Sequence, residues 1–298
     1  MRYFPEPVKG VLTFLLITVN TAILAPTVIF LGVVKLVLPL KSFYKIFAKI
    51  NVMISERWIG NNAFIVRLMH KIQWEVQGLD TLKRRSWYLV VSNHQSWVDI
   101  LVLQTIFHRR IPFLKFFLKK ELIWVPIMGL VWWALDFPFM KRYSQEFLKK
   151  NPHLKGKDIE ITRKACEKFK ANPISVMNFV EGTRFTDAKH KKQQSPHSHL
   201  LKPKAGGVAF VFGAMGDYLD SILNVTIAYP QGIPTFWDFL CGRVNDIMVR
   251  VEPIPITDEL LGDYYNDPEY RARFQGWVND LWAEKDKTVS NLLDHHMN

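Results

Sequence analysis

The stretch from Val8 to Leu40 constrains the fold of this chain most strongly, because it is almost wholly apolar and only Lys9 and Lys35 within it are charged. A segment of this length is long enough to cross a lipid bilayer as a helix. A cleaved signal peptide explains it poorly, since the apolar region is too long and no small-residue cleavage site follows it. We therefore expect the N-terminus to attach the chain to a membrane.

Two arrangements of this segment remain open. Its middle contains Asn20, Thr21 and Pro26, which suit a single span poorly, and basic residues flank both of its ends. Because basic flanks favour the cytoplasmic side, a helical hairpin bent near Pro26 and confined to one leaflet fits better than a tilted span. Residues 41–72 follow as an amphipathic helical connector that we expect at the membrane interface.

The composition of the whole chain narrows its possible partners. The formal net charge is +12, which calls for an anionic partner such as nucleic acid, a membrane surface or a phosphorylated substrate. Nucleic acid is not expected, because no nucleic-acid fold signature accompanies the charge. Cys166 and Cys241 have no metal or redox spacing and suit a reducing compartment. These features fit a bacterial inner membrane with the active site on the cytoplasmic side.

Beyond residue 72, short apolar runs alternate with segments of helical periodicity. This alternation predicts a single α/β domain with a central sheet flanked by helices. We expect this catalytic domain over residues 73–298, behind a membrane-attached helical segment over residues 1–72. The expected strands cover residues 74–76, 87–91, 111–118, 174–180, 223–228 and 246–251. The expected helices cover residues 100–107, 122–135, 157–171, 206–215 and 274–282. Residues 137–142 are expected to be extended, and residues 190–199 to form a flexible loop.

The stretch from Val90 to Asp99 carries the first candidate chemistry. An apolar strand leads into His94 and helical spacing follows, so His94 lies at a strand-to-helix turn that can hold a side chain rigidly beside a cleft. Asp99 lies about one helical turn further on. A carboxylate bonded to one ring nitrogen leaves the other free to accept a proton, as activation of a hydroxyl requires. Ser96-x-x-Asp99 also matches a helix-capping box, so catalysis and capping both stay open here.

Polar groups also follow two later apolar segments. Arg142 ends one extended piece, and Glu181, Gly182 and Arg184 follow a buried strand. Ligand sites in α/β sheets gather beyond the carboxyl ends of strands, and two arginines suit the oxygens of a phosphate. Glycine would let the backbone approach a ligand. Taken singly, these residues could be a surface cation and a local ion pair, but their placement after strands favours a phosphate site.

Four ordered blocks carry a resemblance to a known family. They are Asn93-His94-x-x-x-x-Asp99, Phe139-x-x-Arg142, Phe179-Val180-Glu181-Gly182-Thr183-Arg184 and Ile227-Ala228-Tyr229-Pro230. Together they resemble the glycerolipid acyltransferases, the family of the 1-acylglycerol-3-phosphate (lysophosphatidic acid) acyltransferases. Residues 181–186 with the Lys/His-rich loop after them resemble the branch that contains lysocardiolipin acyltransferase. The blocks span nearly half of the chain, and the fourth departs from the commoner form at Ala228-Tyr229.

The resemblance implies a membrane-bound enzyme that moves a fatty acyl group from acyl-CoA or acyl carrier protein to the free hydroxyl of a lysophospholipid, most simply lysophosphatidic acid. His94 would act as general base and Asp99 would orient it, with no covalent acyl-enzyme. We expect backbone amides near residues 95–97 to supply the oxyanion donors. The substrate-binding residues would be Asn93, which would also shape the turn, and Arg142, Glu181, Gly182, Thr183, Arg184 and Lys204.

No metal or prosthetic group is implied by the resemblance, and we expect no cofactor beyond the acyl donor. His190, His197 and His199 lie in a polar stretch without fixed ligand geometry, so a metal site is not expected there. The expected partners are the lysophospholipid acceptor, anionic lipid head groups and the acyl donor. Acylation or transacylation of another lysophospholipid remains an alternative, as does a non-catalytic adaptor that binds anionic lipid, which His94 and Asp99 disfavour.

Overall fold

The computed structural model describes residues 4–38, 41–140, 160, 163, 166–167 and 172–297. They form a six-stranded sheet with helices on both faces, which confirms the predicted α/β class. The strands of this sheet are β1 (Gln73–Gln77), β2 (Tyr88–Ser92), β3 (Leu114–Phe116), β6 (Ser175–Phe179), β7 (Ser221–Ala228) and β8 (Asp246–Pro255), and β4 (Leu118–Lys119) pairs separately with β5 (Phe139–Met140). The helices are α1 (Glu6–Val37), α2 (Lys41–Met69), α3 (Val98–Phe107), α4 (Met128–Ala134), α7 (Asp187–Gln193), α8 (Ala205–Met215), α9 (Phe236–Cys241) and α10 (Pro268–Met297).

Strand direction decides where a site can form in this sheet. The strand order is β1-β8-β7-β2-β6-β3. β7, β2, β6 and β3 run parallel to one another, whereas β8 runs antiparallel to β7 and parallel to β1. The chain therefore leaves β2, β6 and β7 at the same edge of the sheet. The turns that follow these three neighbouring strands begin side by side there.

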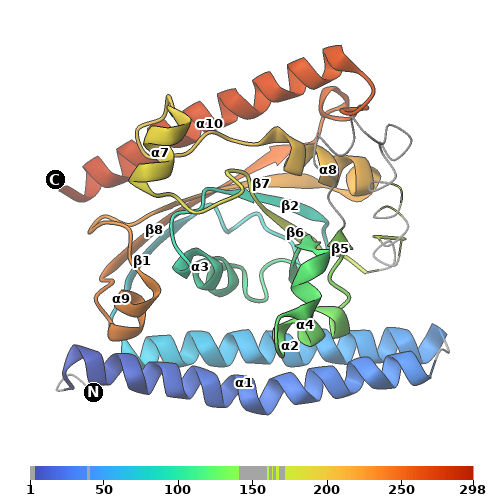
Figure 1. Ribbon diagram of the computed structural model, residues 1–298, viewed down its shortest axis with the longest axis vertical. Helices are drawn as coiled ribbons and strands as arrows, with labels where there is room; N and C mark the ends of the chain where they lie inside the picture. The colour runs from blue at the N-terminus through green and yellow to red at the C-terminus, as the bar shows by residue number, and fades with distance from the viewer. Residues whose placement is uncertain are drawn as a thin grey trace.

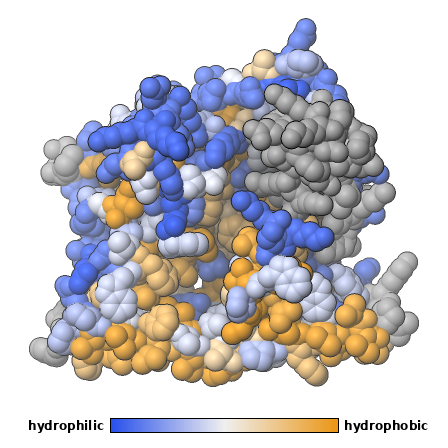
Figure 2. Space-filling model, in the orientation of Figure 1, coloured by the Kyte–Doolittle hydropathy of each residue, from blue (hydrophilic) through white to orange (hydrophobic). Residues whose placement is uncertain are grey.

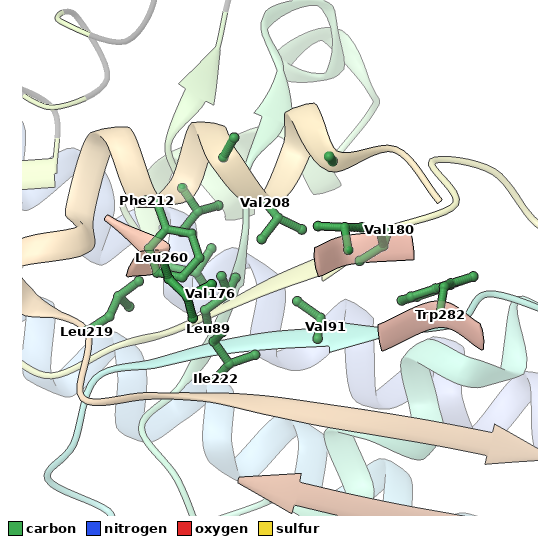
Figure 3. Packing of buried hydrophobic residues seen from close by; sticks show 14 of the residues in the cluster. Leu89, Val91, Val176, Val180, Val208, Phe212, Leu219, Ile222, Leu260 and Trp282 are labelled. Carbon is green, nitrogen blue, oxygen red and sulfur yellow. The ribbon is translucent and has the colours of Figure 1, made fainter. Parts of the chain in front are cut away.

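Helices cover both faces of the sheet, with α8 and α10 on one side and α3 on the other (Figure 1). β2 shows how the sequence pattern produces these layers. Leu89 and Val91 belong to the core beneath α8 and α10, whereas Tyr88 and Val90 belong to the core around α3. Successive strand residues point to opposite faces, so a wholly apolar strand serves both cores. Figure 3 shows Val208 of α8 above Leu89 and Val91.

The N-terminal helices α1 and α2 lie side by side and run in opposite directions along one side of the domain (Figure 1). The bend expected near Pro26 is wrong: α1 continues through Pro26, and the chain reverses between α1 and α2. An interior proline removes one hydrogen bond and crowds a preceding carbonyl, at a cost of about 3 kcal/mol, and the packing of α1 against α2, α4 and α9 offsets this cost. The helix predicted within residues 41–72 is present as α2.

Helix α1 buries several polar and small residues against the protein and exposes most of its large apolar side chains. Asn20, Gly32 and Lys35 are buried, whereas Phe14 and Phe30 are exposed. Figure 2 shows the resulting apolar band along α1. Among the described residues, α1 is the one helix long and apolar enough to cross a bilayer. A contiguous apolar surface of this kind marks contact with a membrane or another protein.

Close packing explains why polar and small residues are needed on the inner side of α1. The ammonium of Lys35 donates to the carbonyl of Ala134 at 2.7 Å and pairs with Asp136 at 2.8 Å. A Cβ on Gly32 would come within 2.5 Å of the Ala134 Cβ, so glycine lets α1 approach α4 closely. These contacts attach the N-terminal helices to the α/β domain.

Several elements differ from the sequence-based predictions. The helix predicted over 122–135 is broken, because Pro126 lacks a backbone donor and Ile127 has a φ of 62°, so α4 begins only at Met128. The loop predicted over 190–199 begins inside α7, whose N-cap Thr186 accepts a hydrogen bond from the Lys189 N–H. The strand predicted over 111–118 is divided into β3 and β4. Arg142 and most of the helix predicted over 157–171 lie outside the described residues.

Candidate active site

The turn after β2 places His94 beside Asp99. Asp99 lies in the first turn of α3, and its Oδ2 lies 2.9 Å from His94 Nδ1. Asp99 is fully buried, whereas the His94 imidazole lines a pocket of about 380 Å³. A carboxylate at Nδ1 keeps the proton on that nitrogen and leaves Nε2 as the basic one. The pair therefore has the geometry of a general base.

The same carboxylate also caps α3. Its Oδ2 accepts hydrogen bonds from the backbone N–H groups of Gln95 at 2.6 Å and Ser96 at 2.9 Å. The Ser96 hydroxyl accepts in turn from the Val98 N–H at 3.2 Å. Capping and orientation of His94 are thus compatible, because one oxygen serves both. The expected oxyanion role is wrong for Gln95 and Ser96, whose amides point to Asp99 instead.

The second oxygen of Asp99 is held by Tyr229, which follows β7. The Tyr229 hydroxyl donates to Asp99 Oδ1 at 2.6 Å. Burial and the neighbouring carboxylate keep the pKa of this hydroxyl well above its ordinary value of 10, so it remains a donor. The residue at which the fourth sequence block departs from the commoner form therefore contacts the candidate catalytic pair directly.

We expect Tyr229→Phe to lower turnover about tenfold, because a hydrogen bond to a charged group contributes roughly 1.5 kcal/mol or more and this one fixes the partner of His94. The KM for either substrate should change little, since Tyr229 does not line the pocket. Tyr88→Phe is the matched control. Tyr88 is also buried in this sheet, but its hydroxyl accepts from the Lys83 N–H at the other end of β2. Equal turnover in the two variants would contradict the role of Tyr229.

The turn after β6 holds His94 from two sides. The imidazole stacks on Phe179, with ring centroids 3.8 Å apart and planes inclined by 12°. The His94 N–H donates to Glu181 Oε1 at 2.9 Å, and its carbonyl accepts from the Phe185 N–H at 2.7 Å. Both the backbone and the ring of His94 are thereby fixed, as efficient proton transfer requires.

Glu181 binds backbone groups in the interior of the protein. It is fully buried, and its second oxygen accepts a hydrogen bond from the Leu201 N–H at 3.0 Å. Burial raises the pKa of Glu181 from 4.5 to about 7, although the His94 and Leu201 amides act in the opposite direction. Because both oxygens are engaged by backbone amides, Glu181 positions His94 rather than contacting a substrate, which corrects the binding role expected for it.

Asn93 is also a positioning residue. Its side-chain amide donates to the Ile227 carbonyl at 2.8 Å and accepts from the Ile227 N–H at 2.9 Å. The side chain thus continues the pairing of β2 with β7 beyond the last strand residue, and it is fully buried. Asn93 shapes the turn, as expected, but both ends of its amide are occupied, so the substrate-binding role is wrong.

Lys285 of α10 is a buried residue that sequence reasoning missed. Its ammonium donates to the Val225 carbonyl at 2.5 Å and to the Thr226 hydroxyl at 3.2 Å. Burial lowers its pKa from 10.5 to about 7, against the opposing effect of Glu252 and Glu181. One signal was available: position 285 shares the apolar face of its helix with Val278, Trp282 and Val289, so a lysine there meets the core.

Two cations border the polar side of the pocket. The Arg184 guanidinium lies over the Trp97 ring, 4.4 Å from its centroid. Gly182 has a φ of 69°, which favours glycine, and a Cβ there would lie 3.3 Å from the Lys204 ammonium. Lys189 donates to the Thr183 hydroxyl at 2.8 Å and to the Arg184 carbonyl at 2.9 Å, which fixes this turn to α7. The side chains of Trp97 and Lys189 were not expected at the site.

Much of the remaining pocket lining is apolar. Aromatic and aliphatic side chains from β3, β6 and α8 line it, including Phe116, Met177, Phe210 and Val211. A ligand that carries both an anionic group and a hydrocarbon chain would match this division. In the part of the chain that the structure describes, no cluster of three or more His, Cys, Asp or Glu side chains could hold a metal ion.

Comparisons with known proteins agree on one family. A family model described as Acyltransferase matches residues 73–228. The 1-acyl-sn-glycerol-3-phosphate acyltransferase epsilon of Mus musculus is 22% identical over 238 residues, which cover 72% of this chain and 60% of that protein. The corresponding delta protein of Homo sapiens is 25% identical over 209 residues, 66% of this chain and 51% of that protein. The chain thus spans only half to three fifths of these relatives.

A solved structure is also similar to this chain. The crystal structure of the 1-acyl-sn-glycerophosphate acyltransferase from Thermotoga maritima superposes with a TM-score of 0.49 and 15% sequence identity. The superposition covers 96% of this chain and 98% of that one.

Proposed function

Because this chain belongs to the acyltransferase family, whose model matches more than half of it, we propose that it transfers a fatty acyl group to the free hydroxyl of a lysophospholipid. The observation that carries this proposal is the buried Asp99 carboxylate on His94 Nδ1, beside a pocket whose lining includes two cations and several apolar side chains. A lysophospholipid supplies the three matching features, namely a hydroxyl, a phosphate and a hydrocarbon chain.

In the proposed reaction, His94 Nε2 takes the proton of the acceptor hydroxyl while that oxygen attacks the carbonyl carbon of an acyl thioester. The tetrahedral intermediate then breaks its carbon–sulfur bond. The thiolate leaves and takes the proton from the imidazolium, so an ester and a thiol are formed and His94 is regenerated. Asp99 and Tyr229 keep the imidazole in place throughout.

The cations at the pocket suggest how the acceptor is recognised. Arg184 and Lys204, which both line the pocket, are the proposed partners of the acceptor phosphate. Lysophosphatidic acid, with an exposed phosphate monoester, is the acceptor we propose first. Arg142 remains a proposed phosphate ligand from the sequence pattern. The proposed donor is acyl-CoA or acyl carrier protein, and no further cofactor is invoked.

We also propose that the enzyme sits on one leaflet of a membrane through α1 and α2. The outward apolar side of α1 and the exposed Ile46, Met53 and Phe64 of α2 support this arrangement. A lysolipid could then reach the pocket from the leaflet while a soluble donor arrives from the aqueous side. The cytoplasmic side of a bacterial inner membrane fits the basic residues that flank α1.

The direct test is thiol release from oleoyl-CoA by the detergent-solubilised protein, with and without lysophosphatidic acid. The proposal expects acceptor-dependent release together with formation of phosphatidic acid. Parallel reactions with oleoyl carrier protein and with other lysophospholipids identify the donor and the head group. Acyl exchange between phospholipids without any thioester would instead show a transacylase. Inertness toward every donor and acceptor would favour the anionic-lipid adaptor.

A further inference from the structure

A groove rich in cations lies between α2 and the α/β domain, away from the catalytic turn. One part, of about 700 Å³, is lined by Lys49, Arg57, Arg84, Arg85 and Arg109 together with Met53 and Glu56. An adjoining cavity of about 490 Å³ shares Glu56, Arg57 and Arg109 with it. That cavity shares Gly60, Phe64 and His108 with a third, of about 1270 Å³. The three cavities therefore adjoin one another along α2, and together they are called the groove.

This groove is distinct from the pocket that contains His94. Arg84 and Arg85 precede β2, whereas His94 follows it, so they lie at opposite edges of the sheet. Helix α3 likewise begins beside the catalytic turn and ends at Phe107, and its ten residues extend about 15 Å. Arg109 lies beyond that far end. The groove cations are therefore separate from those that border the pocket.

The charge of the groove is largely uncompensated. Lys49, Arg57, Arg85 and Arg109 are exposed, and within the described ranges none of them forms an ion pair. The one acid in the first cavity, Glu56, is nearly buried and binds the Arg84 guanidinium through both oxygens, at 2.8 and 2.7 Å. Several cations that line the groove can therefore bind an anionic group.

Apolar side chains form the outer border of the same groove. Met53 and Phe64 are each more than half exposed and line its cavities, and Ile46 is exposed on the same helix. They extend the apolar surface by which α1 and α2 are proposed to enter a leaflet. With α1 and α2 in a leaflet as proposed, cations beside this surface would meet the phosphates of anionic lipids. A soluble phosphate would have no use for the apolar border.

We propose that this groove binds the head-group phosphate of an anionic phospholipid of the surrounding membrane, as a second lipid site apart from the catalytic pocket. The hydrocarbon chains of that lipid would lie against Met53 and Phe64. The site would orient the domain on acidic membranes. The inference rests on the proposed membrane attachment, and it does not depend on acyl transfer.

The test uses a photoreactive phosphatidylglycerol, with the probe carried on its acyl chain, in neutral detergent micelles with the full chain. Crosslinked peptides are mapped by mass spectrometry, so labelling of the groove (residues 53–67 and 105–110) is separated from labelling of the pocket (residues 116–117 and 207–211). We expect Arg57→Glu/Arg85→Glu to reduce groove labelling at least about tenfold and to leave pocket labelling unchanged. A phosphatidylcholine probe should label the groove weakly in both proteins.

A control carries the same change of charge elsewhere. Arg273→Glu/Lys287→Glu changes exposed residues on α10, on the other side of the sheet (Figure 1). This control should keep wild-type groove labelling, and all variants should keep wild-type thiol release in micelles. Equal labelling in groove and control variants, or displacement of the probe by CoA or inorganic phosphate, would overturn the proposal.

Discussion

Replacement of His94 by alanine is expected to reduce acceptor-dependent thiol release by about a thousandfold. A positioned general base contributes roughly a hundredfold to ten-thousandfold, and His94 Nε2 is the basic nitrogen that Asp99 leaves available in the pocket. A thousandfold loss corresponds to about 4 kcal/mol in the activation barrier. The measurement is initial rate at saturating donor and acceptor, with release in the absence of acceptor subtracted.

The effect should come from the lost base and leave the fold intact. His94→Gln provides the comparison, because glutamine fills part of the space on Phe179 and can accept a hydrogen bond but is not basic. Both variants should be similarly inactive, should bind lysophosphatidic acid with near wild-type affinity and should melt within a few degrees of the wild type. Activity within tenfold of wild type in either variant would show that the proposed mechanism is wrong.

Glu181→Gln is expected to affect both stability and turnover. Both carboxylate oxygens accept backbone N–H groups, from His94 and Leu201, so an amide would direct its NH₂ group at one of these donors. A buried donor left without a partner destabilises by roughly 1–3 kcal/mol. The looser backbone at His94 should lower turnover about tenfold to a hundredfold, since small misplacements of reacting groups have effects of this size. Thermal melts and initial rates on one preparation measure both.

The same substitution has a signature in its pH dependence. The folded-state pKa of Glu181, about 7, lies above its ordinary value of 4.5, so between these values the folded state binds more protons than the unfolded state. Protonation of Glu181 therefore contributes to the free energy of unfolding in full below about pH 4.5. This contribution, roughly 3 kcal/mol, is lost as the pH rises through 7. Glutamine does not titrate, so the stability advantage of wild type over Glu181→Gln should shrink from pH 5 to pH 7.5.

The Lys285→Met variant distinguishes the pH dependence of stability that comes from Glu181 from the one that comes from the buried Lys285 ammonium. Burial shifts the pKa of Lys285 downward from 10.5 to about 7, so its contribution to stability rises with pH between about 7 and 10.5. The pH range in which Lys285 changes the free energy of unfolding therefore lies above the range in which Glu181 does. A stability difference between wild type and Glu181→Gln that stayed constant from pH 5 to pH 7.5 would contradict the assignment.

Much of the candidate site could be predicted from the sequence, because its parts are local. His94 and Asp99 are five residues apart, and a turn into a helix brings such residues together whatever the rest of the fold does. The apolar strands before His94 and Glu181 were likewise visible as short runs. Local patterns of this kind also predicted the α/β class, since alternating strands and helices allow few other architectures.

The residues that support the turn at His94 come from distant parts of the chain and are brought there by the tertiary structure. Tyr229 reaches Asp99 across 130 residues, and Glu181 reaches the His94 amide across 87. Both contacts exist because β7 and β6 flank β2 and run parallel to it, an order that no local pattern contains. The same holds for Asn93 and Glu181, whose polar side chains suggested ligand binding but form hydrogen bonds with backbone groups, those of β7 for Asn93 and those of His94 and Leu201 for Glu181.

For the N-terminal helices, too, some features follow from the local sequence and others from packing. The apolar run from Val8 to Leu40 predicted a helix long enough to enter a membrane. That α1 continues through Pro26 and turns Asn20, Gly32 and Lys35 inward depends on how α2 and α4 pack against it, and no local pattern contains that information. Composition fixes how much apolar surface a segment has, whereas packing fixes which side of it remains exposed.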